Sequence, residues 1–274
     1  MRITMPNPTD SLGVLLQTQG EAVSQIQNDV LLSSSLWVNI ALAGLAALLF
    51  VYMGRNVSAG RPRLIWAATL MIPLVSISSY LGLLSGLTVG FIEMPAGHAL
   101  AGEEVMSQWG RYLTWALSTP LILLALGLLA DADTGSIFAV IAADVGMCLT
   151  GLAAALVTSS YLSRWLFYVI SCAFFAVVLY ALLVEWPQSA AAAGTGEIFG
   201  TLRALTVVLW LGYPIIWAVG VEGFALVQSV GLTSWAYSAL DVLAKYVFSF
   251  LLLRWVAANE SVVSNSGVGS FADD

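Results

Sequence analysis

Seven long apolar stretches, separated by short connections, limit what this chain can fold into more than any other feature. They span residues 35–53, 63–86, 107–130, 136–158, 161–184, 201–220 and 232–257. Most reach the roughly 20 residues that an α-helix needs to cross a bilayer, and none alternates like an outer-membrane barrel strand. Only 9% of the residues are charged, against about 25% in soluble domains. The sequence therefore predicts an all-α membrane protein with a bundle of seven transmembrane helices.

The two ends of the chain are predicted to be tails. Residues 1–33 are polar and lack the apolar core of a secretory signal, so they predict an extracellular N-terminal tail. Residues 34–258 form the transmembrane domain. Residues 259–274 are rich in Ser, Gly and Asp and predict a disordered cytoplasmic tail.

Loop charge predicts the orientation, because cytoplasmic loops carry an excess of Lys and Arg. With an odd number of spans, five arginines fall on the same side of the membrane: Arg55, Arg61, Arg63, Arg203 and Arg254. The opposite side has Arg2 and Arg164 as its only bases. We therefore expect the N-terminus outside and the C-terminus in the cytoplasm.

Lys245 is the only lysine of the chain and lies in the middle of the last apolar stretch, with Asp241 four residues before it. A charged side chain at bilayer depth costs at least about 2.5 kcal/mol, so such residues usually serve a function. A lysine amine condenses with carbonyl compounds to form a Schiff base, which desolvation favours. Lys245 and Asp241 therefore predict a covalently held chromophore or cofactor with its counter-ion one turn away.

The third apolar stretch contributes a second group of polar residues. Arg111, Thr114 and Ser118 are spaced i, i+3 and i+7, so they share one helix face. Counted from the predicted outer ends of the helices, their depths match those of Asp241 and Lys245. We therefore expect Arg111 to approach Asp241, and both hydroxyls to approach the amine of Lys245.

The charges of these residues do not balance when Lys245 carries a protonated Schiff base. Arg111 and the iminium then face a single negative charge on Asp241, and an uncompensated buried charge is expensive. A bound anion would restore neutrality, and the hydroxyls of Thr114 and Ser118 suit chloride rather than a proton, because neither residue is a carboxylate. The alternative is that both hydroxyls bond to carbonyls of their own helix.

Trp210, Tyr213 and Trp217 form an aromatic stripe on the sixth apolar stretch, again spaced i, i+3 and i+7. Such a stripe usually packs a core, but together with Trp115 it would also form a slot for a flat conjugated ligand. Pro214 removes one hydrogen bond of this helix and permits a kink.

Other polar residues are predicted to be structural. Asp144 has no base near it in the sequence, so we expect a protonated, hydrogen-bonded carboxyl that supports the fold or tunes a chromophore. Cys148 and Cys172 are expected to be small buried hydrophobes. His98 follows a glycine-rich stretch and is predicted to be a surface-loop histidine. The sequence has no Cys/His cluster with metal-ligand spacing and no nucleotide-binding glycine loop.

Three motifs carry a resemblance to a known family. They are RYLTWALSTP at 111–120, WLGYPIIW at 210–217 and LDVLAKY at 240–246. This set resembles the microbial rhodopsins, and the resemblance covers the chain apart from its two tails. Within that family, Thr114 is typical of the chloride-pumping branch of haloarchaea. Proton-pumping members carry Asp at the position of Thr114 and a second Asp eleven residues later, where this chain has Ala125.

The resemblance implies a part for each group of residues. It implies all-trans retinal as the covalent cofactor on Lys245, with Asp241 and Arg111 completing the counter-ion complex. It also implies a chloride ion bound by Thr114, Ser118 and Arg111. Arg203 and Thr206 are implied to line the cytoplasmic half of the ion path. The residues implied to enclose the retinal are Trp115, Met147, Gly151, Trp210, Tyr213 and Trp217.

The function implied by the resemblance is a light-driven inward chloride pump of the cell membrane, which is not an enzyme. Such a pump is implied to form a homotrimer among membrane lipids and to need neither nucleic acid nor a soluble partner. Two alternatives stay open. One is a sensory rhodopsin that signals through a transducer, although sensory members commonly keep the carboxylate that Thr114 replaces. The other is a light-independent seven-helix receptor or transporter in which Lys245 is unmodified.

Overall fold

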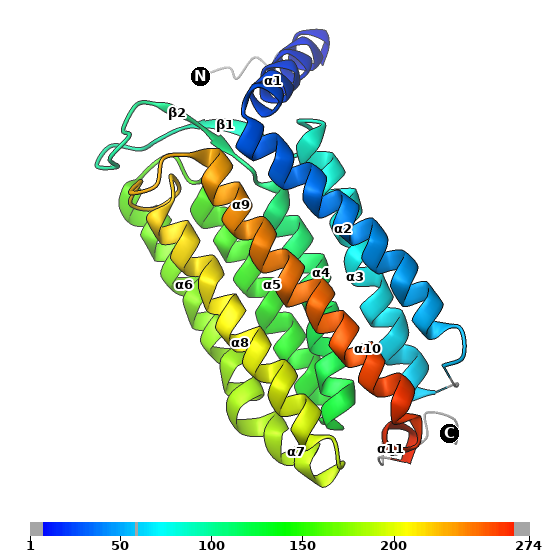
Figure 1. The fold of residues 1–274 in the computed structure, drawn as a ribbon. Coiled ribbons are helices and arrows are strands. Elements are labelled where there is room, and N and C mark those ends of the chain that lie inside the picture. Colours follow the sequence, from blue (N-terminus) through cyan, green and yellow to red (C-terminus); the bar gives the residue numbers. More distant parts are fainter. Residues whose placement is uncertain (1–7, 58–59, 266–274) are drawn as a thin grey trace.

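Seven long helical segments lie side by side in one bundle in the computed structural model, which describes residues 8–57 and 60–265 (Figure 1). The segments are α2 (Val30–Gly54), α3 (Arg61–Leu84), α4 (Gly110–Ala130), α5 (Thr134–Leu156), α6 with η1 and α7 (Tyr161–Tyr180, Ala181–Glu185, Trp186–Ala192), α8 (Gly196–Val219), and α9 with η2 and α10 (Val230–Asp241, Val242–Val247, Phe248–Ala258). All seven are long and apolar enough to cross a membrane. The predicted seven-helix bundle is therefore confirmed, although the fifth segment continues to Ala192 and the sixth begins earlier, at Gly196.

The outer faces of the helices are as apolar as the core, as expected for a protein solvated by lipid. Leu45, Leu162 and Val208 are 63%, 79% and 68% exposed. In the core, Leu123 and Phe248 are fully buried. Because a soluble protein rarely exposes such extensive apolar surface, the surface of the bundle agrees with a position in the bilayer.

Short polar side chains fix where several helices begin. Oδ1 of Asp29 accepts a hydrogen bond from the N–H of Leu32 at 3.0 Å, at the start of α2. Oδ2 of Asp133 accepts from the N–H of Ser136 at 3.1 Å, before α5. Serine hydroxyls cap α6 and α9 in the same way. Each cap satisfies a backbone donor that the first helical turn leaves unpaired.

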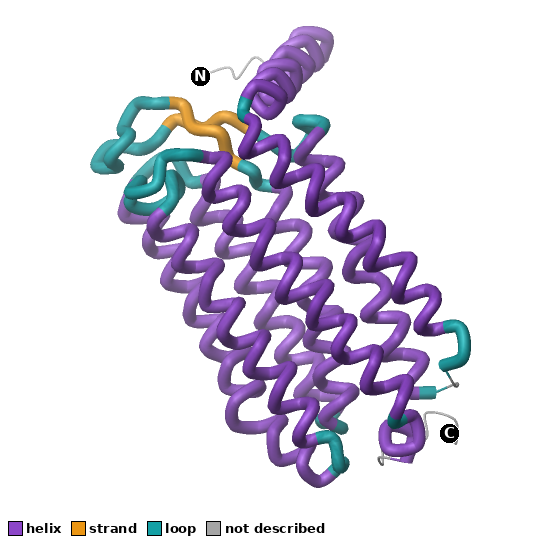
Figure 2. Tube along the Cα trace, in the orientation of Figure 1, coloured by secondary structure: helices purple, strands orange, loops and turns teal. Residues whose placement is uncertain are grey.

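The two ends of the bundle differ in structure (Figure 2). β1 (Gly90–Glu93) and β2 (Glu104–Ser107) pair antiparallel at the end where α1 (Pro8–Asn28) projects, and α11 (Glu260–Asn265) lies at the opposite end. These two helices lie within the predicted tails, so the prediction of disorder is wrong for residues 260–265. Residues 30–33 of the predicted N-terminal tail belong to α2, and residues 1–7 and 266–274 of the two tails lie outside the described residues.

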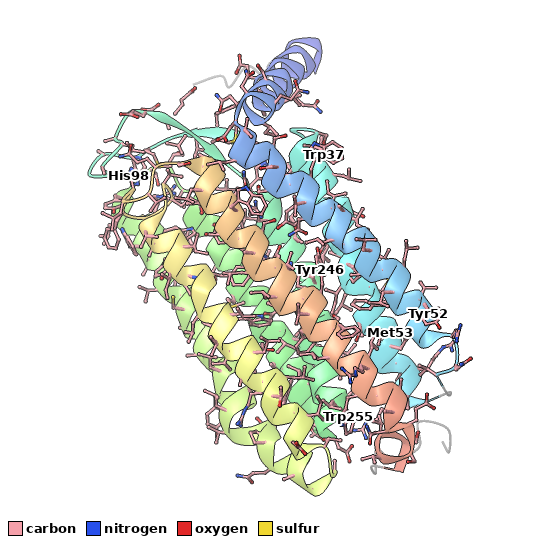
Figure 3. The ribbon with its side chains drawn as sticks, in the orientation of Figure 1. Trp37, Tyr52, Met53, His98, Tyr246 and Trp255 are labelled. Atoms are coloured by element: carbon pink, nitrogen blue, oxygen red, sulfur yellow. The ribbon has the colours of Figure 1, made fainter. Side chains whose placement is uncertain are left out.

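His98 is buried, which corrects the prediction of a surface-loop histidine. It lies between β1 and β2 at the α1 end of the molecule and is 5% exposed (Figure 3). Its Nδ1 accepts from the N–H of Leu100 at 3.1 Å, and its ring meets Tyr161 edge-on at 5.3 Å between centroids. Burial and the charge of Arg164 lower the pKa of His98, against the opposing effect of the Gly223 and Val221 backbone.

Arg164, one of the two bases predicted on the N-terminal side, is also fully buried. Its guanidinium donates to the carbonyls of Ala155 and Val157 at 2.9 Å, and to the carbonyl of Glu222 at 3.0 and 3.3 Å. The first two carbonyls lie at the end of α5, where a helix leaves acceptors unpaired and its dipole is negative. Arg164 therefore ties the α5–α6 turn to the connection between α8 and α9.

Candidate functional site

Lys245 and Asp241 form a buried ion pair in the middle of the last segment. Nζ of Lys245 lies 3.0 Å from Oδ1 of Asp241, and both side chains are 1% exposed. The pair spans the junction of α9 with η2, a π-helical stretch that contains Lys245. Such π-helical stretches occur frequently at functional sites. The predicted amine and counter-ion are thus side by side, out of contact with solvent.

Two tyrosine hydroxyls hold the carboxylate of Asp241. Tyr80 on α3 donates to Oδ2 at 2.9 Å, and Tyr213 on α8 donates to Oδ1 at 2.7 Å. Hydrogen bonds to an ionised acceptor are stronger than neutral ones, so the two hydroxyls favour a negative charge here. The sequence pattern did not single out Tyr80, and it placed Tyr213 only in the aromatic slot. The signal for Tyr80 was its place at the end of the polar run SISSY, residues 76–80, inside an apolar helix.

Arg111 reaches Asp241 through Tyr80 rather than directly, which refines the prediction. Its Nη1 donates to the hydroxyl of Tyr80 at 3.1 Å, and its Nη2 donates to Ser234 Oγ at 2.7 Å. Its Nε donates to Gln108 Oε1 at 2.6 Å. The guanidinium is only 3% exposed and is therefore fixed by three neutral acceptors. The phenol of Tyr80 therefore lies between the guanidinium of Arg111 and the ion pair, and it hydrogen-bonds to both.

Thr114 and Ser118 differ in their hydrogen bonding. Thr114 donates to the carbonyl of Gly110 in its own helix at 2.9 Å and contacts the hydroxyl of Ser79. Ser118 is fully buried, and its hydroxyl has no partner among the described residues. The alternative that both hydroxyls bond to their own helix therefore holds for Thr114 but not for Ser118. An unpaired buried hydroxyl is costly, so Ser118 is a donor available to a ligand.

The six residues predicted to enclose a flat ligand all line one cavity. They are Trp115, Met147, Gly151, Trp210, Tyr213 and Trp217. The same cavity has Tyr112 and Tyr237 in its wall, which the sequence analysis did not single out. The ring of Trp115 packs against those of Tyr213 and Tyr237, with centroids 5.1 and 5.3 Å apart. Because the hydroxyl of Tyr213 also bonds Asp241, this residue joins the cavity to the ion pair.

The remaining predicted residues lie away from the ion pair. Thr206 is fully buried about three turns into α8 and donates to the carbonyl of Leu202 at 2.9 Å, and Arg203 is partly buried one turn before it. Asp144 is hydrogen-bonded as predicted, accepting from Thr119 at 2.6 Å. Ala125 is fully buried in the apolar core.

The site fits a conjugated carbonyl compound and a small anion. The aromatic cavity offers apolar walls to a flat polyene. Lys245, the single lysine of the chain, is linked to that cavity through Asp241 Oδ1, which also accepts from the lining residue Tyr213. No geometric hydrogen bond reaches its Nζ among the described residues, apart from the ion pair with Asp241. Ser118 offers an unpaired donor on the neighbouring helix α4. The donor set thus suits one covalent ligand and one anion.

Comparison with known proteins gives a consistent set of relatives. Residues 30–259 match the family model of the bacteriorhodopsin-like proteins. The chain is 73% identical to halorhodopsin of Halobacterium salinarum over 256 residues, which cover 93% of each chain. It is 68% identical to cruxhalorhodopsin-3 of Haloarcula vallismortis over 265 residues, which cover 96% of each.

Solved structures agree with these matches. A halorhodopsin described as a light-driven chloride pump has a TM-score of 0.85 at 78% identity, covering 86% of this chain and 99% of that one. A bromide-bound halorhodopsin from Halobacterium salinarum has a TM-score of 0.85 at 77% identity, covering 88% and 99%. A light-driven proton pump from Leptosphaeria maculans still reaches 0.76 at 30% identity, covering 84% and 96%. Because pumps of different ions share this bundle, the ion must be argued from the site.

Proposed function

This chain belongs to the family of bacteriorhodopsin-like proteins, and we propose that it is a light-driven pump that moves chloride into the cell. The observation that carries the proposal is the charge of the buried cluster. Lys245 and Arg111 supply two positive charges, and Asp241 is the one carboxylate bonded to them through the described contacts. Thr114 stands where the resemblance places an Asp in proton-pumping members of the family. An anion is therefore needed to balance the cluster.

We propose that all-trans retinal binds covalently to Lys245, with its polyene in the aromatic cavity. Bound there, it would supply a light-driven isomerisation that turns the N–H of the Lys245 nitrogen. Trp115, Trp210 and Trp217 line the cavity, where they would exclude water and hold a flat ligand in one plane. Asp241, fixed by Tyr80 and Tyr213, stays in place as the counter-charge.

The anion path is proposed to run along α4 and α8. Arg111 attracts chloride at the outer side, and Ser118, next to Thr114 on the same helix face, donates a hydrogen bond to it near the Lys245 nitrogen. Thr206 and Arg203 would line the inner exit, toward which a turned N–H would present its hydrogen bond. Access would then alternate about one fixed site.

Orientation and assembly are part of the same proposal. The α1 and β-hairpin end faces the outside, and the end with Arg55, Arg61 and Arg63 faces the cytoplasm, as the loop charges indicate. The chain is a transporter in the cell membrane, and we propose that it acts as a homotrimer without enzymatic activity or a soluble partner.

Light-driven chloride uptake tests the function directly. The protein is expressed with all-trans retinal, purified, reconstituted in liposomes and illuminated while internal chloride is followed with a chloride-sensitive dye. We expect a coloured protein that moves chloride in the light and a saturable spectral shift when chloride replaces sulfate. Lys245→Ala should be colourless and inactive. A coloured parent without ion movement would instead indicate a sensor, and a colourless parent would indicate a light-independent protein.

A further inference from the structure

A chain of buried hydrogen bonds runs along the contact of α2 with α9 and η2, beside the proposed ion site. Its members are Ser35, Asn39, Arg111, Ser234, Ser238 and Tyr246, each 6% exposed or less. Tyr246 lies at mid-height of the bundle and packs against α2 (Figure 3). Polar groups at this depth in a membrane protein commonly serve a function.

The first arm of this chain begins at the guanidinium of Arg111. Nη2 of Arg111 donates to Ser234 Oγ at 2.7 Å, and Ser234 Oγ lies 2.6 Å from Ser35 Oγ. The hydroxyl of Ser35 also has the carbonyl of Leu32 as an acceptor at 2.8 Å, and when its one proton is directed there, Ser234 donates to Ser35. In that arrangement, each hydrogen bond of this arm is donated in the direction from Arg111 toward Ser35.

The second arm begins next to Lys245. The hydroxyl of Tyr246 donates to Asn39 Oδ1 at 2.6 Å, and Asn39 Nδ2 donates to Ser238 Oγ at 2.9 Å. Ser238 Oγ in turn donates to the backbone carbonyl of Ser35 at 2.9 Å. The amide orientation of Asn39 is forced, because Nδ2 also donates to the carbonyl of Ser238 at 3.2 Å. This arm also ends at Ser35.

The directions of the bonds decide what the chain of residues can do. The first arm reaches the hydroxyl of Ser35, whereas the second reaches its backbone carbonyl, which carries no proton, so no continuous path of exchangeable protons joins the two arms. The side chain at the centre of the second arm is an amide, which neither gains nor loses a proton readily. The bonded residues therefore form a fixed strut rather than a proton relay.

Asn39 spans the π-helical stretch that carries Lys245. One end of its amide bonds Ser238 in α9, before η2 begins, and the other end bonds Tyr246, the residue after Lys245. Because Tyr246 directly follows Lys245, a displacement of the Tyr246 backbone also displaces Lys245. The same strut ends at Arg111, the second cation of the cluster.

We propose that Asn39 is a positioning residue that holds the turn bearing Lys245 at a fixed distance from Arg111, and so sets the size of the anion site. The proposal rests on the proposed function, since it concerns a chromophore on Lys245 and an anion between the two cations. Among the described contacts, Asn39 makes no hydrogen bond to Lys245, Asp241 or Arg111. Its effect reaches them through Tyr246 on one side and through Ser35 and Ser234 on the other.

Removal of one hydroxyl tests the strut. Tyr246→Phe deletes the donor to Asn39 and keeps the ring, and the matched control Ser34→Ala deletes the acceptor of a different α2–α9 bond, from Trp235 Nε1 at 3.2 Å. We expect Tyr246→Phe to shift the visible absorption maximum and to raise the chloride dissociation constant about two- to tenfold, as the loss of one neutral hydrogen bond allows. The control should move neither. Equal spectra and equal chloride affinity in Tyr246→Phe and the parent would overturn the proposal.

A double variant separates coupling through Ser35 from two independent effects. Tyr246→Phe and Ser234→Ala each cut one arm, so their fold-changes in chloride affinity should combine to less than their product. Fold-changes that multiply in full would show that the arms do not act together, which would also overturn the proposal. If Tyr246→Phe does not fold, Ser238→Ala cuts the same arm and replaces it in both measurements.

The same experiments distinguish failure of the strut from failure of the proposed function. The absorption maximum reports the placement of Lys245 in any retinal-bound form, whether or not chloride is transported. A parent that is coloured but indifferent to chloride would contradict the pump alone. An unchanged spectrum in both Tyr246→Phe and Ser238→Ala would contradict the strut alone.

Discussion

The bridge that Tyr80 forms between Arg111 and Asp241 should dominate the stability of the charge cluster. Its hydroxyl accepts from Arg111 Nη1 at 3.1 Å and donates to Asp241 Oδ2 at 2.9 Å, so Tyr80→Phe removes two hydrogen bonds to charged groups. Tyr213→Phe is the comparison variant, because it removes one such bond, from the partly buried Tyr213 of α8 to Asp241 Oδ1 at 2.7 Å. Both changes delete one oxygen atom and keep the ring.

The magnitudes follow from the number of bonds lost. A hydrogen bond to a charged group contributes about 1.5–3 kcal/mol. Tyr213→Phe should therefore lower the midpoint of thermal bleaching by roughly 3–12 °C, at about 2–4 °C per kcal/mol for a chain of this size. Tyr80→Phe should cost about twice as much, because it leaves both an N–H of Arg111 and one oxygen of Asp241 without a partner.

The assay is thermal bleaching of the retinal-loaded protein, followed by loss of its visible absorption in the same detergent and salt. The expected order is the parent, then Tyr213→Phe, then Tyr80→Phe, with the second shift near twice the first. If Tyr80→Phe bleaches at the temperature of the parent, or above Tyr213→Phe, the bridge does not stabilise the cluster and the reasoning is wrong.

Three further changes test other parts of the structure. Thr114→Asp should weaken chloride binding about a thousandfold in a spectral titration, because like charges ~4 Å apart repel by about 4 kcal/mol at an effective dielectric of 20; unchanged affinity would contradict the electrostatic account. Burial lowers the pKa of His98 from its usual 6.5, so the unfolded chain binds the proton more tightly and stability is lost as the pH falls below 6.5. The midpoint of thermal bleaching should therefore fall less between pH 8 and pH 5 in His98→Gln than in the parent. Gly54→Ala should abolish the yield of folded protein, because its new Cβ would lie 1.7 Å from Trp66 Nε1, whereas Gly44→Ala has nothing within 4 Å of its Cβ and should express normally.

Apolar length and three charged residues were enough to predict the fold and the centre of the site. A run of about 20 apolar residues has few alternatives to a membrane-spanning helix. Charge is rare in such runs, which is why the sequence identified Lys245, Asp241 and Arg111. Asp241 and Lys245 also lie four residues apart in one helix. The helix ends were less predictable, since residues such as Glu185 and Glu197 are polar and yet lie within spans.

What the sequence could not give was the contacts between helices. The polar run SISSY, residues 76–80, is unusual inside an apolar helix, but a sequence does not show which group a tyrosine hydroxyl meets, so the contact of Tyr80 with Asp241 was not predicted. Helical periodicity also does not reveal a π-helical stretch such as η2, because the extra residue in the turn leaves no mark on composition. The burial of His98 was not predicted for the same reason. His98 lies in the loop between β1 and β2, and it packs against Tyr161 at the start of α6, far away in the sequence.

The difference between Thr114 and Ser118 explains how the cluster can favour an anion over another carboxylate. The hydroxyl of Thr114 already donates a hydrogen bond to the carbonyl of Gly110. The buried hydroxyl of Ser118, in contrast, has no partner among the residues that the structure describes. A buried polar group left unpaired costs about 1–3 kcal/mol. A halide at Ser118 would recover that cost and balance the excess positive charge of Lys245 and Arg111 at one place. A carboxylate at position 114 would balance the charge but would lie one turn of helix away from Ser118. In the proposed pump, hydrogen bonding and charge would therefore both favour a small mobile anion at Ser118.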